Sequence, residues 1–311
     1  MGIYTELVLE ARELAAGEVE GVASSVATLK YGIRRSDIAV KSAAAAKQLG
    51  RKQGRYITVE AKEILARNLD ANVYLAKVIG KALGELLGGL CLPKDYLALV
   101  VGIGNRGMTA DALGPKVVDN LIVTRHFKEE GQKAEARFGN VCAIAPGVLG
   151  ETGIETFDVL NGLTEKVKPD VVLVVDSLAS RRAERIATTF QLSDSGLTPG
   201  GGLRDNRPAL NRETLGVPVI AAGVPFVVYA KTMGQDVVEE LFRRLPSYAA
   251  PNSYQVNHSL RAVVTDLFGD LVVTPKDIDQ IIKDCAFVLS LAFNLALHNR
   301  LSAEDILSFV R

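Results

Sequence analysis

The sequence predicts an α/β fold in which a mostly parallel β-sheet is flanked by helices, with a helical region at the C-terminal end. Two observations predict this fold. A hydrophobic content of 48% can fill a substantial core. Four short runs are rich in β-branched residues, and each is bounded by Gly, Pro or Asp and followed by a helical pattern. Such runs predict strands that are buried on both faces. They lie at residues 97–101, 141–144, 171–175 and 217–221.

Helical periodicity accounts for much of the remaining chain. Residues 70–87 place leucine and isoleucine on one side and lysine on the other, and Gly88 and Gly89 end the pattern. Further helices are predicted at 154–167 and 234–245. Thr274 has the pattern of a capping box for a helix running to about His298, where a cation would suit the helix dipole, and Ser302 begins another.

These elements indicate one α/β domain over residues 1–311. Residues 1–95 form an N-terminal region without a clear alternation of strands and helices, residues 96–245 form the core of the sheet, and residues 246–311 form the C-terminal helical region.

Composition narrows the classes of function. The 36 Lys and Arg balance the 36 Asp and Glu and are scattered, so no stripe for nucleic acid or an anionic membrane surface is expected. The three cysteines lie far apart in apolar surroundings, which is typical of reduced thiols in a cytoplasm. The N-terminus lacks a signal-peptide pattern, and no apolar stretch approaches the ~20 residues of a membrane span. We expect a cytoplasmic protein.

Two aspartates lie where such a sheet would bind a ligand. Ligands bind beyond the carboxyl ends of parallel strands, where loops from neighbouring strands converge. Asp111 follows the strand at 97–101, on the loop or first helical turn after it, and Asp176 ends the strand at 171–175. If these strands are near neighbours, both carboxylates lie at the same edge. Asp111 and Asp176 are therefore the candidate catalytic residues.

The sequence leaves three interpretations of this pair open. Two carboxylates a few ångströms apart cannot both ionise, so one can act as base for a water and the other as acid. The same pair could instead hold a divalent cation that activates water. Each aspartate could also only accept backbone N–H bonds at a helix start, since Asp is a favoured N-cap residue.

Four further polar residues are candidates for binding substrate or supporting the pair. Gly102 and Gly104 predict a tight turn that delivers Asn105 to the edge of the sheet. The segments GETGIET (150–156) and QLSDSGLTPGGG (191–202) are dense in Gly, Thr, Ser and carboxylates, although helix capping or a mobile loop would explain them too. The candidates are Asn105, Thr152, Glu155 and Asp194. No acidic strand-end residue suits a dinucleotide ribose, and no cofactor is predicted.

Motifs spread over most of the chain resemble the germination protease family of endospore-forming bacteria. They occur in the same order as in that family. These are YTELVLEARE near the start, GRYITVEA (54–61), GIGNRGMTADALGP (102–115), PGVLGETGIET (146–156), VVDSLASR (174–181), QLSDSGLTPGGGLRDNR (191–207), LGVPVIAAGVPFVV (215–228) and VTPKDIDQII (273–282).

The resemblance implies a cytoplasmic endopeptidase of the spore core that degrades small acid-soluble spore proteins during germination. It also implies a homo-oligomer, a tetramer, made as a precursor that loses a short N-terminal segment; about four residues here precede the point where the mature form begins. The fold is similar to that of hydrogenase maturation endopeptidases. The two aspartates essential in the family lie in motifs that here read TADALGP and VDSLASR, which match Asp111 and Asp176.

Several positions near these motifs depart from the family pattern. Arg106 stands where the family has Trp, Ala110 where it has Pro, Phe226 where it has Thr, and Tyr229 where it has Asp. These departures could change the choice of substrate or lower the activity. Two alternatives also stay open: a metal-dependent protease of the maturation type, and a catalytically silent paralogue that binds a spore protein.

Overall fold

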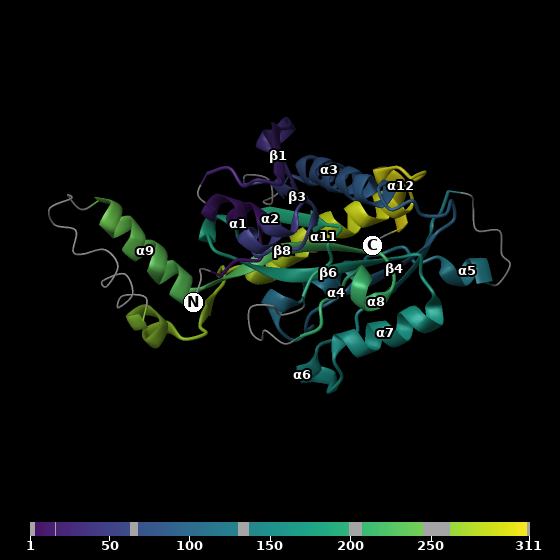
Figure 1. Ribbon diagram of the computed structural model, residues 1–311. Coiled ribbons are helices and arrows are strands. Elements are labelled where there is room, and N and C mark those ends of the chain that lie inside the picture. Colours follow the sequence, from purple (N-terminus) through teal and green to yellow (C-terminus); the bar gives the residue numbers. More distant parts are fainter. Residues whose placement is uncertain are drawn as a thin grey trace.

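The central part of the sheet is parallel. In the computed structural model, which describes residues 4–15, 17–62, 68–129, 137–198, 207–244 and 262–309, four strands follow the apolar runs of the sequence (Figure 1). They are β4 (Leu97–Gly102), β5 (Asn140–Ile144), β6 (Val171–Ser180) and β8 (Val219–Tyr229). β4 lies between β5 and β6, and β6 pairs with β8. The predicted α/β class is confirmed.

The N-terminal region adds an antiparallel half to the same sheet. β1 (Val22–Thr28), β2 (Arg34–Val40) and β3 (Gly54–Glu60) pair in that order, and β7 (Thr189–Ser193) joins β3 to β8. The short β9 (Val272–Val273) pairs with the end of β8.

The expectation of a mostly parallel sheet is therefore corrected to a mixed sheet of order β1-β2-β3-β7-β8-β6-β4-β5. The physical reason is that β1 is exposed and β2 alternates polar and apolar residues, so neither is the continuous apolar run by which buried parallel strands are recognised.

Helices cover both faces of the sheet. On one face α3 (Leu69–Gly88), α4 (Leu113–Val118) and α11 (Ile278–Leu297) form the main core with alternate residues of β4 and β6. On the other face α7 (Thr156–Val167) and α8 (Arg212–Leu215) pack on the remaining residues, while α1 (Val8–Leu14) and α2 (Ala43–Leu49) pack on β2 and β3. The other helices are α5 (Arg125–Glu129), α6 (Leu149–Thr152), α9 (Ala230–Arg244) and α12 (Ala303–Phe309).

The C-terminal helices match the prediction with one difference at a helix start. α12 begins as expected, because the Ser302 hydroxyl accepts a hydrogen bond from Asp305 N (3.0 Å) and the Asp305 carboxylate accepts one from Ser302 N (2.9 Å). α11 begins at Ile278, after Thr274, and Asp277 occupies its N-cap position without a side-chain bond. α11 is long and apolar enough to cross a membrane, but most of it is buried against α3 and the sheet.

His298 follows α11 and is completely buried. Its Nδ1 accepts a hydrogen bond from Gly139 N (3.1 Å), so Nε2 carries the proton and donates to Ile122 O (3.0 Å). Burial lowers the pKa of His298. The expected cation at this helix end is thus corrected to a neutral imidazole that bonds two neighbouring segments.

Burial of a neutral histidine makes stability depend on pH. Below the ordinary pKa of 6.5 the unfolded chain binds a proton that folded His298 does not, so stability falls as pH falls below that value. We expect the free energy of unfolding of His298→Gln to fall less than that of wild type between about pH 7.5 and 5.5, by at most about 1.4 kcal/mol per pH unit. Urea unfolding measures this. The exposed His126→Gln variant is the control, and equal slopes for wild type and His298→Gln would contradict the assignment.

Candidate active site

A glycine-rich turn folds the chain back across the end of β4. Gly104 has φ +127°, and a Cβ there would lie 1.8 Å from the carbonyl oxygen of Asp111. A Cβ at Gly102 would lie 2.1 Å from the carbonyl oxygen of Gly114. Together with Gly107 these glycines have the spacing of a dinucleotide fingerprint, but their closest neighbours are backbone atoms of the returning segment. The turn therefore serves to bring Asp111 onto the strand end.

Asp111 points back into this turn. It ends the 3₁₀ turn Thr109–Asp111, and its Oδ2 accepts a hydrogen bond from Asn105 N (2.8 Å). α4 starts two residues later with Ala112 at its N-cap, which makes no side-chain bond. Asp111 is therefore not the cap of α4. Partial burial raises the pKa of Asp111, and the negative charge of Glu151 adds to this, whereas the Asn105 N–H lowers it.

Asp176 lies within β6 and not at its end, because the pairing of β6 with β8 continues to Ser180. Its side chain is 6% exposed, and Ser177 N donates to its Oδ1 (2.8 Å). Ile103 N donates to Val175 O (2.8 Å), which fixes the glycine turn beside Asp176. Burial raises the pKa of Asp176 well above its usual range, and the negative charges of Asp111 and Glu6 raise it further.

The two aspartates thus form an interacting pair with unequal environments. Asp176 is the more buried of the two, and its pKa is raised further than that of Asp111. Arg207 lies close enough for its positive charge to lower the pKa of both carboxyl groups. Such a pair favours one bound proton over two ionised carboxylates.

Asp176 also borders a cavity of ≈ 370 Å³ between the sheet and the N-terminal segment. The N-terminal segment runs beside the end of β6: Glu6 N donates to Ala179 O (3.0 Å), and Ala179 N donates to Glu6 Oε2 (2.6 Å). Gln191 Nε2 donates to Glu6 O (3.1 Å). The sequence did not indicate these residues. The other polar lining residues include Tyr4, Arg51, Tyr56, Ser193 and Ser195.

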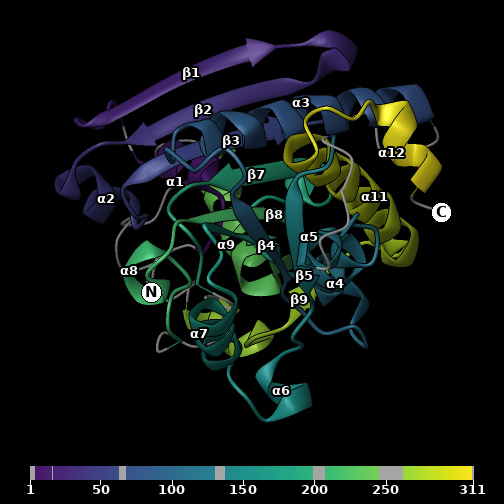
Figure 2. The ribbon, with the colours of Figure 1, turned by 90° about the vertical axis from the view of Figure 1, so that its right-hand side faces the viewer.

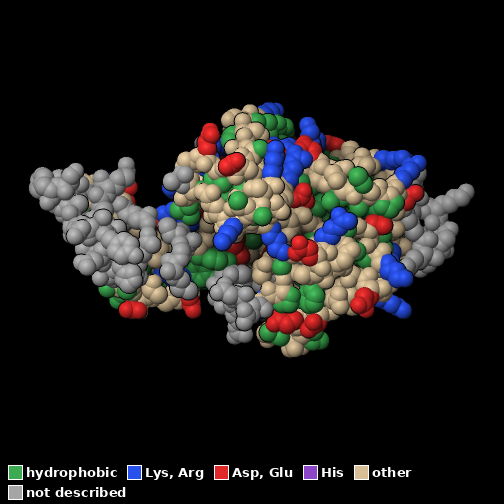
Figure 3. Space-filling model, in the orientation of Figure 1, with side chains coloured by type: hydrophobic (Ala, Val, Ile, Leu, Met, Phe, Trp, Pro, Cys, Tyr) green, Lys and Arg blue, Asp and Glu red, His purple; other side chains and the backbone are tan. Residues whose placement is uncertain are grey.

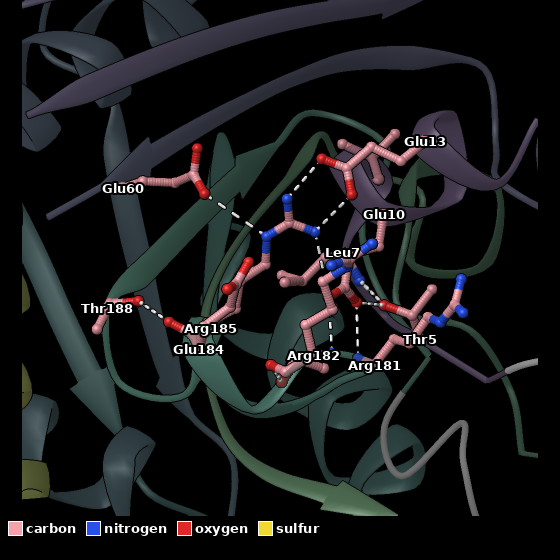
Figure 4. Close-up of polar contacts among 12 residues, drawn as sticks. Thr5, Leu7, Glu10, Glu13, Glu60, Arg181, Arg182, Glu184, Arg185 and Thr188 are labelled. Atoms are coloured by element: carbon pink, nitrogen blue, oxygen red, sulfur yellow. Dashed lines mark hydrogen bonds and ion pairs between the residues drawn. The ribbon is translucent and has the colours of Figure 1, made fainter. Parts of the chain in front are cut away.

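A buried ion network holds this N-terminal segment in place (Figure 4). Glu10 is fully buried and accepts hydrogen bonds from the backbone N–H groups of Arg181 (2.7 Å) and Arg182 (3.0 Å). Arg185 pairs with Glu10 (3.2 Å) and with Glu13 (2.6 Å). The network ties α1 to the loop that follows β6, and so ties the segment to the strand that carries Asp176.

The structure gives three of the four predicted supporting residues local roles. Asn105 Oδ1 accepts a hydrogen bond from Gly107 N (2.6 Å), which shapes the turn. Thr152 is exposed and its hydroxyl bonds the backbone of Val148 and Ile154. Asp194 Oδ1 accepts from Arg55 N (2.7 Å), which joins β7 to β3.

Glu155 stands at the N-cap position of α7 without a side-chain cap bond. The negative charge of Glu151, in the same segment as Thr152 and Glu155, raises the pKa of Asp111. Of the four supporting residues, only Asn105 contacts the pair. Asp194 does not line the cavity, although its neighbours Ser193 and Ser195 do.

Most departures from the family pattern point away from the pair. Arg106 forms a two-bond ion pair with Asp119 (2.7 and 2.9 Å) at the surface. Ala110 packs against the main core and Phe226 is buried inside it. Tyr229 contacts a cavity residue, because its ring lies edge-on to Tyr4 with centroids 5.4 Å apart.

Within the described ranges, no three His, Cys, Asp or Glu side chains gather as they would around a metal ion. The aspartate pair therefore offers a metal only two side chains from this part of the chain.

Comparisons with known proteins place the chain in a family. The family model described as germination protease matches residues 5–260. The chain is similar to the germination protease of Caldanaerobacter subterraneus subsp. tengcongensis, with 42% identity over 98% of this chain and 97% of the relative. It is 37% identical to that of Clostridium perfringens (strain ATCC 13124), over 99% of both chains.

These similarities make the chain a peptidase. More particularly, it belongs to the germination protease family and is an endopeptidase of spore germination. A solved [NiFe] hydrogenase maturation protease from Thermococcus kodakarensis is also similar, at 16% identity and a TM-score of 0.34, over 68% of this chain and 98% of that one. That TM-score is too low to support a conclusion, so the predicted likeness to the maturation fold stays a prediction.

The glycine turn predicts a matched pair of variants. Gly104→Ala would force a Cβ into the Asp111 carbonyl at a positive φ, so we expect a loss of about 2 kcal/mol or more in unfolding free energy and a loss of peptidase activity. Gly162→Ala, in α7 with open space around it, should change stability by less than about 1 kcal/mol and keep activity. Chemical denaturation and a peptidase assay measure both. A fully stable and active Gly104→Ala would show that the close approach is not required.

Proposed function

We propose that this endopeptidase hydrolyses small acid-soluble spore proteins during germination and uses Asp111 and Asp176 to activate water. The observation that supports this most is the unequal burial of two interacting carboxyl groups, which raises the pKa of Asp176 well above that of an ordinary aspartate. A carboxylic acid beside a carboxylate supplies both the acid and the base that peptide hydrolysis needs.

In this mechanism Asp111 is the base and Asp176 the acid. The Asn105 N–H stabilises ionised Asp111, which takes a proton from the water as its oxygen attacks the peptide carbonyl carbon. Asp176 holds its proton until the tetrahedral intermediate collapses and then gives it to the leaving nitrogen. The positive charge of Arg207 stabilises the negative charge that develops on the carbonyl oxygen.

The way the N-terminal segment is bound favours two parts of this proposal, a peptide substrate and a precursor form. Backbone groups at the end of β6 and the side chain of Gln191 bind residues 6–8 beside Asp176, and a substrate backbone would use the same groups. In this arrangement the chain's own Tyr4, Thr5 and Glu6 line the cavity. Loss of about four N-terminal residues would therefore take Tyr4 out of the cavity lining and leave Thr5 and Glu6 in place.

We also propose that the protein acts as a homo-oligomer in the cytoplasm of the spore core, without a cofactor and without direct nucleic-acid or membrane partners. Acidic and basic side chains are interspersed on the face shown in Figure 3, which does not favour a polyanionic ligand there.

The aspartate pair predicts a specific pattern of activity. Asp111→Asn and Asp176→Asn should each lower the rate of cleavage of a purified small acid-soluble spore protein by about 10²-fold or more, since each removes one proton-transfer group. Glu155→Gln should keep activity, because its carboxylate caps no helix and is not among the charges that shift the pKa of Asp111. Thermal unfolding checks that each variant folds.

The same assay separates the alternatives. Loss of wild-type activity in a chelator, restored by added metal, would favour a metal-dependent mechanism. If wild-type protein binds the spore protein but cleaves none of it, and Asp111→Asn binds equally well, the protein is a binding paralogue and the proposed function is wrong.

A further inference from the structure

β1 (Val22–Thr28) is an unprotected edge of the sheet. It pairs with β2 on one side, and the sheet order places it at the end (Figure 2). Every residue of β1 after Val22 is exposed, so side chains on both of its faces lie in solvent. Strands at a sheet edge carry unpaired backbone N–H and C=O groups, which are a ready template for another strand.

The usual features that prevent edge pairing are missing from β1. Its sequence VASSVAT contains no charge, no proline and no glycine. Its register with β2 runs from Val22 opposite Val40 to Thr28 opposite Arg34 without a bulge. Natural proteins ordinarily block an exposed edge with lysine, proline or a bulge.

The hydrogen bonds that flank β1 show which of its residues face outward. Lys41 N donates to Gly21 O (2.8 Å), and Leu29 N donates to Ile33 O (2.7 Å). Gly21 and Leu29 are therefore hydrogen-bonded to the β2 side. In an antiparallel pair, residues that bond the partner strand alternate with residues whose backbone N–H and C=O groups point away from it. Counting inward from both ends, residues 23, 25 and 27 bond β2, and Ser24, Val26 and Thr28 present their N–H and C=O groups to solvent.

We propose that β1 pairs antiparallel with β1 of a second copy of this chain, about a two-fold axis near Ser25. This register places Val22 opposite Thr28 and Ser24 opposite Val26, so the outward groups of each copy meet and no like charges face each other. A strand paired with its own copy is self-complementary, as a two-fold interface requires.

A bound peptide fits this edge less well than a second copy does. Peptides that add to a sheet edge gain their specificity from side-chain pockets beside it. The side chains of β1 stand in solvent on both faces, and β1 lines neither the cavity beside Asp176 nor the one between α3 and Leu295. The proposal rests on the self-association put forward under Proposed function and assigns its surface.

A proline at an outward position tests this pairing. Val26→Pro removes an N–H that faces solvent and leaves the β1–β2 hydrogen bonds intact, because edge strands tolerate proline at such positions. Val26→Thr keeps the N–H and the β-branched shape and is the matched control. We expect sedimentation velocity to give Val26→Pro a particle mass lower than wild type by a factor of about two or more, with Val26→Thr unchanged.

Three other results would overturn the proposal. If the wild-type protein is a monomer, both the proposed self-association and its assignment to β1 are wrong. A wild-type oligomer whose mass Val26→Pro leaves unchanged rejects the edge but keeps self-association. A loss of mass only in Val237→Lys, which changes an exposed apolar residue on α9, would place the interface there instead. Because cleavage by the aspartate pair is assayed separately, failure of the edge and failure of the catalytic proposal are distinguishable.

Discussion

The burial of two interacting carboxyl groups is the constraint on which the site depends. Asp176 is buried within β6, and the glycine turn after β4 brings Asp111 close enough for its charge to raise the pKa of Asp176. Two negative charges in so dry a place would repel each other strongly, so the folded state favours one proton between them. Because burial makes two ionised carboxylates unfavourable, the pair keeps one proton at neutral pH, so one carboxyl group can act as an acid and the other as a base.

Several features of the fold hold this pair against its own repulsion. The Asn105 and Ser177 N–H groups each bond one carboxylate, and Arg207 supplies a nearby positive charge. The pairing of β6 with β8 continues past Asp176, so the carboxyl group sits in a rigid strand and not on a loop. The network of Glu10 and Arg185 then fixes the N-terminal segment over the cavity, which couples access to the site with the position of that segment.

The sequence predicted the parallel core and the aspartate pair because both leave strong local signals. Continuous apolar runs mark β4 and β6, and an aspartate follows or interrupts each run. The antiparallel strands β1 and β2 lack such runs. Glu6 lines the cavity, but nothing in the sequence around it indicates that it faces a cavity. The polar side chains of Thr152 and Asp194 bond backbone groups nearby, a role that composition cannot distinguish from binding substrate.

The central claim is that Asp176 holds a proton because it is buried and because the negative charge of Asp111 acts on it. It is tested most directly by a carboxyl-carbon NMR titration of aspartate-labelled protein, in wild type and in Asp111→Asn. We expect Asp176 to be protonated at neutral pH in wild type, and its pKa to fall when the neighbouring charge is removed. An Asp176 that is ionised at neutral pH, or whose pKa is the same in both proteins, would contradict the claim.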